Sequence, residues 1–416
     1  MTALHGDELP LLQTPVPGPQ SRAWVDRLAQ RECPAITSRR ARRANALGVA
    51  DTDPVVWKQA RGAVVEDMDG NRFVDLTAGF GVAGIGHRNP VVVKALQDQS
   101  EVLLHAMGDA FPDPKRIELL EQLGGLTGLD HGILGSSGSD AVEAALKTAK
   151  MASGRDGVLC FSGGYHGLSY GALSVIGYKR SAFQAPFSGQ LGDHVVQAEF
   201  GGELPDLSKI GAVIVEPIQG RGGIRVPPAG WHQMLRRACN DAGSILIFDE
   251  IYSAFGRTGR RFASEHFGVQ PDLLCIGKSL AGGFPISACM GTQKVMESWG
   301  ASKGEALHTQ TFLGNPLGCA MALAALGEMA RLDLPKRARA IETKLRARLP
   351  NIQIQGKGGM LGLRVPNTLS LSRGLLEKGF LVLPAGESAE VLALTPPLTI
   401  TPAQLDAFVM ALESLL

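Results

Sequence analysis

The chain has 416 residues, of which 44% are hydrophobic and 19% are charged, as is typical of a globular protein. This length exceeds one ordinary domain and predicts two or three domains that share an extensive core. The formal net charge of +1 gives no field that would attract nucleic acid or a membrane surface. One basic cluster lies near the N-terminus, but no aromatic residues interleave it, so we expect a solvated or partner-facing segment. Its members are Arg39, Arg40, Arg42 and Arg43.

The six cysteines are widely scattered, no pair has C-x-x-C spacing, and most lie inside apolar runs. We therefore expect buried, reduced thiols and no metal site. The first residues lack the basic flank and apolar stretch of a signal peptide, and no apolar run approaches the length of a membrane span. These features predict a cytoplasmic protein. The cysteines are Cys33, Cys160, Cys239, Cys275, Cys289 and Cys319.

The N-terminal half begins with a Pro- and Arg-rich stretch up to about Pro54, which has no clear period and predicts an irregular arm. Two alternating segments then flank Asp69 and Gly70. This pattern predicts a β-hairpin, because glycine tolerates the positive φ of a tight turn. Apolar spacing over residues 90–104 predicts a helix.

Five short apolar runs follow, separated by Gly-rich turns and helical segments. Each is apolar on both faces, as expected for strands of a parallel sheet that helices cover on both sides. The runs are residues 132–134, 158–161, 212–215, 244–248 and 273–276. After residue 314 the sequence predicts a long Ala- and Leu-rich helix, a mixed segment from about residue 349, and a helix over 401–416. We interpret this part as a second, smaller α+β domain.

Ligands bind at the carboxyl ends of parallel strands, so the residue that ends each run matters. Asp249 ends the fourth run and is either a helix cap or a charge that faces the ligand crevice. Lys278 follows the fifth run and is flanked by Gly277, Gly282 and Gly283, which allow close approach of a ligand. A lysine held in such a pocket can lose its proton and act as a nucleophile.

Two further strand ends carry polar groups. Gly138 and Ser139 begin an Ala-rich helix, whose free N–H groups could hold a phosphate; an ordinary cap involving Asp140 is the alternative. Tyr165 and His166 lie in a Gly-rich turn and could stack on a flat ligand or simply pack. Taken together, the amine, the carboxylate, the anion cradle and the aromatic ring match the requirements of pyridoxal phosphate.

At these residues the chain resembles the class III aminotransferases, of the 4-aminobutyrate and ornithine type, among the fold-type I pyridoxal-phosphate enzymes. The resemblance runs from the hairpin at Asp69 to the C-terminal helix. The motifs that carry it are SGSDAVEAALK at 137–147, EPIQG at 216–220, DEI at 249–251, GRTG at 256–259, GK at 277–278 and TFLGNP at 311–316.

The resemblance implies an α/β fold of type I, with a large domain around a mainly parallel seven-stranded sheet and a smaller α+β domain. We place the N-terminal arm and hairpin, joined to the small domain, in residues 1–75. The large cofactor-binding domain is expected over 76–318 and the small domain over 319–416. A homodimer is also implied, in which Thr311 reaches the cofactor phosphate of the neighbouring subunit.

The resemblance assigns roles to individual residues. Lys278 corresponds to the lysine that forms a Schiff base with pyridoxal 5'-phosphate, and Asp249 to the partner of the pyridinium nitrogen. The other expected cofactor contacts are the phosphate turn, the two faces of the ring and two flanking positions. They are Gly138, Ser139, Tyr165, Ile251, His166 and Glu216.

The chain departs from the aminobutyrate and ornithine enzymes at the substrate positions. Their glutamate–arginine pair is replaced by Arg221 and Ala393, so Arg221 either pairs with an acid elsewhere, which we favour, or binds a substrate anion. Leu168 stands where aminobutyrate enzymes have an arginine. Tyr252 replaces a glutamine and could restore its hydrogen bond to the cofactor or pack. Phe80 makes the expected substrate pocket more apolar.

We therefore predict an aminotransferase that moves an amino group from an amine or ω-amino acid to a keto acid or aldehyde by ping-pong kinetics. An amino-acid racemase or epimerase on the same scaffold is the alternative, because the motifs do not distinguish where the proton returns. A cofactor-binding module without activity is a third hypothesis, against which the retained Lys278 and Asp249 argue.

Overall fold

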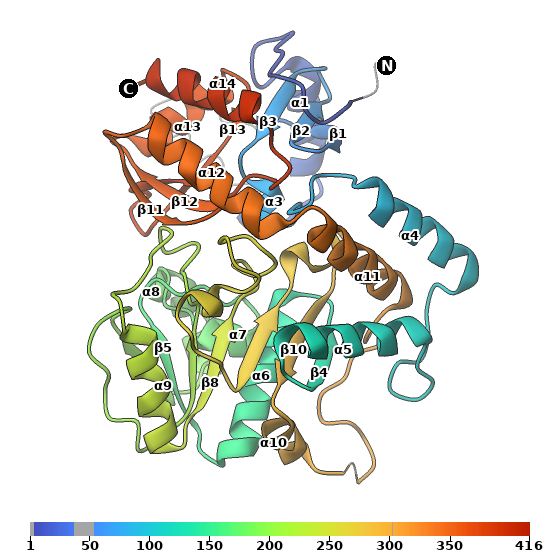
Figure 1. Ribbon diagram of the computed structural model, residues 1–416, viewed down its shortest axis with the longest axis vertical. Helices are drawn as coiled ribbons and strands as arrows, with labels where there is room; N and C mark the ends of the chain where they lie inside the picture. The colour runs from blue at the N-terminus through green and yellow to red at the C-terminus, as the bar shows by residue number, and fades with distance from the viewer. Residues whose placement is uncertain (1–3, 37–53, 302) are drawn as a thin grey trace.

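A seven-stranded sheet forms the centre of the lower part of the molecule in the computed structural model, which describes residues 4–36, 54–301 and 303–416 (Figure 1). The strand order is β4-β10-β9-β8-β7-β5-β6, and only β10 runs antiparallel to its neighbours. The mainly parallel α/β sheet is thus confirmed. The strands are β4 (His131–Gly135), β5 (Gly157–Phe161), β6 (Val195–Ala198), β7 (Ile210–Val215), β8 (Ile245–Asp249), β9 (Leu273–Ile276) and β10 (Ser287–Gly291).

Helices cover both faces of this sheet, which explains why its strands are apolar at every position. In β7, Ala212 and Ile214 belong to the apolar cluster that includes helix α6 (Gly138–Ser153). Val213 and Val215 belong to the opposite cluster, which includes helix α9 (Trp231–Ala242). The five predicted runs all became strands of this sheet. Strands β6 and β10 were not predicted, because β6 is only partly buried and β10 contains small residues rather than a branched apolar run.

Two four-stranded sheets lie above the large sheet in Figure 1. One contains the predicted hairpin, whose strands flank Gly70 at φ +83°. Its fourth strand, β13, comes from the C-terminal part and pairs with β3 in parallel. The other contains only C-terminal strands. The strands are β1 (Trp57–Arg61), β2 (Val64–Asp67), β3 (Arg72–Asp75) and β13 (Phe380–Leu381), then β11 (Gln353–Lys357), β12 (Met360–Arg364), β15 (Val391–Leu394) and β14 (Leu383–Ala385).

Most predicted helices are present. They include α4 (Pro90–Val102), α11 (Pro316–Arg331), which packs beside α4 and α5, and α14 (Pro402–Glu413), which Thr401 caps (Figure 1). The remaining long helices are α5 (Pro114–Thr127), α12 (Leu334–Arg348) and α13 (Thr368–Leu376). Across the described ranges, no helix is both long and apolar enough to cross a membrane. The domain boundaries at residues 75 and 318 remain a prediction.

The expectation of an irregular N-terminal arm is wrong for residues 19–29, which form helix α1 (Pro19–Ala29). The Asp69 carboxylate of the hairpin accepts hydrogen bonds from the N–H groups of Gln20 and Ser21, at 2.7 and 2.8 Å. The helix is therefore capped by a residue distant in sequence, which local pattern does not reveal. Cys33 is exposed, contrary to expectation, whereas the other five cysteines are buried. The basic cluster at Arg39–Arg43 lies outside the described residues.

Candidate active site

The carboxyl ends of four adjacent parallel strands form the floor of a cavity of about 1460 Å³. Strand β5 leads to the turn that carries His166, β7 to Glu216, β8 ends at Asp249, and β9 leads to Lys278. We call these four residues the cavity floor. Because parallel neighbours end at the same edge, strands distant in sequence bring their terminal polar groups together.

Asp249 is held rigidly on this floor and is only 4% exposed. Its Oδ2 atom lies 2.8 Å from His166 Nδ1, and its Oδ1 atom accepts a hydrogen bond from the Ile251 N–H at 3.1 Å. Burial opposes the charged form of His166, but the hydrogen bond to Asp249 and the charges of Asp249 and Glu216 together outweigh burial and raise the pKa of the imidazole above its usual value. The adjacent Glu250 has a structural role, because it accepts from the N–H groups of Ala263 and Ser264.

Glu216 provides a second buried carboxylate. It accepts hydrogen bonds from the N–H groups of Tyr165 and Gly220, both at 2.9 Å, and so fixes the turn after β5 and the turn after β7. Burial raises the pKa of Glu216 to about 7, and the nearby Asp249 charge adds to this effect. Glu216 is therefore able to change its charge near neutral pH.

The Lys278 amine lies 3.9 Å from the centre of the Tyr252 ring. Burial lowers the pKa of this amine to about 8, although the charges of Asp249 and Glu216 act in the opposite direction. The ring itself fits between two glycines, since a Cβ atom on Gly81 or Gly220 would come within 2.3 Å of a ring carbon. The two glycines thus leave room for the Tyr252 ring, on whose face the Lys278 amine lies.

The Tyr252 hydroxyl lies 2.9 Å from the Thr395 Oγ1 atom, to which it is hydrogen-bonded. Thr395 in turn donates to the Thr77 carbonyl at 3.2 Å. The ring thus packs between two glycines and its hydroxyl is engaged with Thr395, whereas a hydrogen bond from Tyr252 to the cofactor remains a prediction. Thr395 itself was missed from the sequence, because it follows β15, more than a hundred residues from the floor.

Helix α6 points its N-terminus into the cavity. Ser137 caps the helix and forms a capping box with Asp140. The ordinary helix cap that the sequence offered as the alternative to a phosphate site is therefore present. The first-turn N–H groups of Gly138 and Ser139 nevertheless have no acceptor within the helix, as at any helix start. A Cβ atom on Gly138 would approach Ile251 within 3.0 Å, so glycine keeps this corner open. The cradle is suited to an anion.

Eleven of the twelve predicted site residues line the cavity, and Thr311 does not. Thr311 is exposed on the surface, so its role in a neighbouring subunit remains a prediction. The eleven are Phe80, Gly138, Ser139, Tyr165, His166, Glu216, Arg221, Asp249, Ile251, Tyr252 and Lys278.

Arg221 does not have the acidic partner that we favoured from the sequence. Among the ion pairs of the described residues, none includes Arg221. Its guanidinium carbon instead lies 4.9 Å from the centre of the Tyr165 ring and 5.6 Å from that of Tyr178. Tyr178 was also missed from the sequence. The apolar segment 172–178 gave no sign that this residue would reach the cavity.

The residues present fit pyridoxal phosphate. Lys278 offers an amine of lowered pKa for the aldehyde, and Asp249 offers a fixed carboxylate for the ring nitrogen. The open N-terminus of α6 offers N–H groups for the phosphate. Tyr165 and Ile251 supply apolar surfaces for the ring in the same cavity.

Comparison with known proteins agrees with this fit. The family model of the class III aminotransferases matches residues 47–416. An acetylornithine aminotransferase from Methanosarcina mazei is 37% identical over 86% of this chain and 91% of its own length. A putrescine aminotransferase from Pectobacterium atrosepticum is 36% identical over 84% of this chain and 80% of its own length.

A solved structure is similar in both sequence and fold. It is an amine transaminase from an uncultivated Pseudomonas species in its PLP-bound form, with a TM-score of 0.79 and 29% identity. The match covers 87% of this chain and 94% of that protein. The chain therefore belongs to the class III aminotransferases and has the type I fold. It is an aminotransferase whose cofactor is pyridoxal 5'-phosphate.

Proposed function

We propose that Lys278 and Asp249 form the catalytic pair of this aminotransferase. The observation that carries the proposal is their position on one cavity floor, with an amine whose pKa burial lowers to about 8 and a carboxylate fixed by His166. When bound, pyridoxal phosphate supplies an aldehyde that captures amino groups and a ring that accepts electrons. Lys278 would hold the aldehyde carbon and Asp249 the ring nitrogen.

The floor residues have distinct tasks in this proposal. The neutral Lys278 amine would accept a proton from the substrate carbon and would donate it to the cofactor, as a general base and then a general acid. The hydrogen bond to His166 would hold the Asp249 carboxylate in place beside the ring nitrogen. Glu216 fixes the two turns that border the site.

The remaining contacts follow from the cavity lining. The N–H groups of Gly138 and Ser139 would bind the phosphate at the start of α6. Tyr165 would lie against one ring face and Ile251 against the other. Phe80 and Arg221, which also line the cavity, would contact the substrate.

We also propose that the enzyme is a homodimer. Exposed apolar side chains gather where the segment after α4 meets the segment before α11. These segments touch, because the His105 and Phe312 rings are 5.3 Å apart and Asn315 Nδ2 donates to the Leu104 carbonyl at 3.2 Å. The exposed patch is suited to a second copy of the chain, in which Thr311 would approach the partner's phosphate. Its large apolar members are Val102, Leu104, Met107, Phe111, Leu307 and Phe312.

The donor in this proposal is an amine or ω-amino acid, and the acceptor is a keto acid or an aldehyde. The relatives named above are an acetylornithine and a putrescine aminotransferase. Both of these substrates carry an amino group at the end of a carbon chain, which supports a terminal amino group as the one that reacts. A reducing, cytoplasmic location agrees with six free cysteines. The three-part division at residues 75 and 318 remains part of the proposal.

The experiment that tests transamination is the visible spectrum of the purified holoenzyme while single donors are added without an acceptor. The panel contains acetylornithine, putrescine, ornithine, 4-aminobutyrate, alanine and an aryl amine. We expect one donor to abolish the absorption band of the bound cofactor, and pyruvate or 2-oxoglutarate to restore it. A band that changes without loss, together with inversion of the donor's chirality, would establish racemisation instead.

A further inference from the structure

Arg221 presents a cation to the cavity from the turn that follows β7. The turn is fixed, because the Arg221 carbonyl accepts a hydrogen bond from the Gly386 N–H at 3.0 Å and the Gly220 carbonyl accepts from Ile224 at 3.1 Å. The guanidinium lies against the rings of Tyr165 and Tyr178. An arginine that stacks on an aromatic face keeps its N–H groups available as donors, here to a ligand in the cavity.

The guanidinium has no anionic partner in the protein. Among the described residues, no ion pair or side-chain hydrogen bond of Arg221 to another residue is formed. A partly buried cation loses solvation, and a bound anion restores the lost interaction. Ala393, which also lines the cavity, carries no charge that could supply one.

A second cation lies near the same aromatic ring. Lys179 Nζ is 5.6 Å from the centre of the Tyr178 ring, and Lys179 also takes part in no ion pair among the described residues. The acid on this wall is Glu387, whose carboxylate accepts from the Lys179 backbone N–H at 3.3 Å. This part of the wall therefore carries two unpaired cations around one engaged carboxylate.

Arg221 is also close to the reacting amine. Its positive charge is one of the causes that lower the pKa of Lys278. It acts on Tyr252 as well, the residue on whose ring the amine lies. Arg221 and Lys278 thus line the same cavity, and the guanidinium lies 4.9 Å from the centre of the Tyr165 ring.

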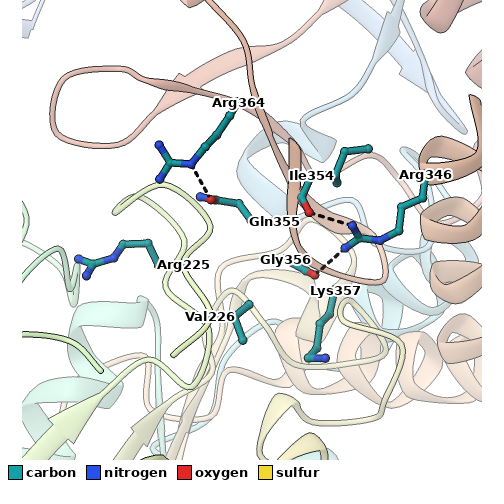
Figure 2. Close-up of a pocket in the computed structure, with 8 residues that line it drawn as sticks. All are labelled: Arg225, Val226, Arg346, Ile354, Gln355, Gly356, Lys357 and Arg364. Carbon is teal, nitrogen blue, oxygen red and sulfur yellow. Dashed lines mark hydrogen bonds between the residues drawn. The ribbon is translucent and has the colours of Figure 1, made fainter. Parts of the chain in front are cut away.

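A basic pocket of about 370 Å³ on the surface is the rival anion site (Figure 2). Its three arginines are already engaged, whereas Lys357 takes part in no ion pair among the described residues. Arg346 donates to the carbonyls of Ile354 and Gly356 at 2.8 and 3.3 Å and pairs with Glu342, as Figure 2 shows for the two carbonyls. Arg225 pairs with Glu199 at 2.8 Å, and Arg364 donates to the Gln355 side chain at 3.0 Å. Among the described residues, fewer cations without an ion pair or a side-chain hydrogen bond therefore remain in this pocket than on the wall around Arg221.

We propose that Arg221 is the carboxylate receptor of the active site, so that the substrates are amino acids and oxo acids rather than plain amines and aldehydes. This inference rests on the proposed transamination. A guanidinium binds a carboxylate through two parallel N–H donors, which gives direction as well as affinity. Because donor and acceptor use the same cavity in turn, one receptor serves both.

The test compares donors that differ only in the carboxylate. Ornithine is compared with putrescine, and 4-aminobutyrate with butylamine, in the holoenzyme and in the Arg221→Met, Arg221→Lys and Arg364→Gln variants. The rate of loss of the cofactor band gives kcat/KM for the first half-reaction. Cofactor content and thermal unfolding show that each variant is folded. Arg364→Gln removes a guanidinium from the surface pocket and is the matched control.

We expect the wild-type enzyme and Arg364→Gln to prefer the carboxylate-bearing donor, and Arg221→Met to lose about 10- to 100-fold in kcat/KM for that donor alone. Arg221→Lys should retain part of the preference. Equal losses for both members of a pair, or a wild-type enzyme without preference, would overturn the carboxylate receptor while leaving transamination intact. A wild-type enzyme that reacts with no donor would instead refute the proposed function.

A binding measurement tests the receptor without turnover. Glutarate, a dicarboxylate that has no amino group, is titrated into the holoenzyme by calorimetry. We expect its dissociation constant to rise at least about tenfold in Arg221→Met and to stay unchanged in Arg364→Gln. An unchanged dissociation constant in Arg221→Met overturns the proposal, whatever the donors do.

Discussion

The floor and the wall of the cavity are built in different ways. The floor residues follow four adjacent strands of one mainly parallel sheet, and hydrogen bonds at the strand ends fix three of them, as the bond to His166 fixes Asp249. The wall comes mostly from segments that approach from elsewhere, apart from the turn at Arg221, which continues from β7. It includes the turn at Phe80, the loop at Arg221 and residues 383–389. The difference indicates that the floor determines the chemistry, whereas the wall determines which substrate reaches it.

The largest effect is expected on the floor, at Lys278. Lys278→Ala removes the only group there that can bind the cofactor covalently and carry a proton. Turnover should fall roughly 10⁴-fold or more, and the absorption band of the covalently bound cofactor should disappear. Steady-state rates and the visible spectrum measure both effects. Lys294→Ala, on the exposed side of α10 (Gln293–Met296), is the matched control and should keep both. An active Lys278→Ala enzyme would move the catalytic role elsewhere.

Asp249→Asn should have the next largest effect. The amide keeps the shape of the carboxylate but removes the charge beside the ring nitrogen, so the ring becomes a poorer electron acceptor. We expect a loss of about 10²- to 10³-fold in kcat with the cofactor retained. Absorbance of the bound cofactor measures retention. A variant that keeps full activity would show that the floor carboxylate is structural, like its neighbour Glu250.

The floor and the wall of the cavity also differ in how well the sequence predicted them. Every floor residue was predicted. Asp249, Lys278 and His166 were found because each follows a short apolar run whose strand character is visible locally, and Glu216 was found through the family resemblance. The wall was predicted only in part, through the family resemblance. The engagement of Tyr252 with Thr395 joins residues more than a hundred positions apart. The ring that supports Arg221, Tyr178, lies in a segment without a functional pattern. Such contacts depend on tertiary packing, which periodicity does not encode.

The amine of Lys278 gives a pH test of the floor. Burial lowers its pKa to about 8, so about one tenth of the amines are neutral at pH 7, and only the neutral amine attacks an aldehyde. In the apoenzyme, the rate of cofactor incorporation should therefore rise about tenfold per pH unit below pH 8 and level off above it. Stopped-flow absorbance measures this rate. Pyridoxal, which lacks the phosphate, is the control for titration of the phosphate.

Glu216→Gln sharpens that test. The Glu216 charge raises the pKa of Lys278, so its removal should move the midpoint of the profile to lower pH. A midpoint that stays the same would mean that Glu216 acts only through the backbone N–H groups of Tyr165 and Gly220. A profile that is flat between pH 6 and 9 would contradict the lowered pKa itself.

The smallest effect is expected on the wall, at Phe80. This residue is 55% exposed and has φ +64°, within the short segment α3 (Ala78–Gly81) that has left-handed backbone angles. Such a conformation costs about 1 kcal/mol or more for a residue with a side chain and little for glycine. Phe80→Gly should therefore leave the free energy of unfolding unchanged or raise it by up to about 1 kcal/mol, after its greater unfolded-state entropy is included.

The same substitution should weaken selection of apolar donors. Loss of the ring removes apolar contact area at the wall, so kcat/KM for an aryl amine should fall about 3- to 10-fold, while that for alanine changes little. Phe80→Ala removes the same ring but keeps the strained backbone. It should match Phe80→Gly in selectivity and be less stable to urea. If the two variants differed in selectivity but not in stability, the left-handed turn would contribute to the shape of the wall rather than only carry the ring.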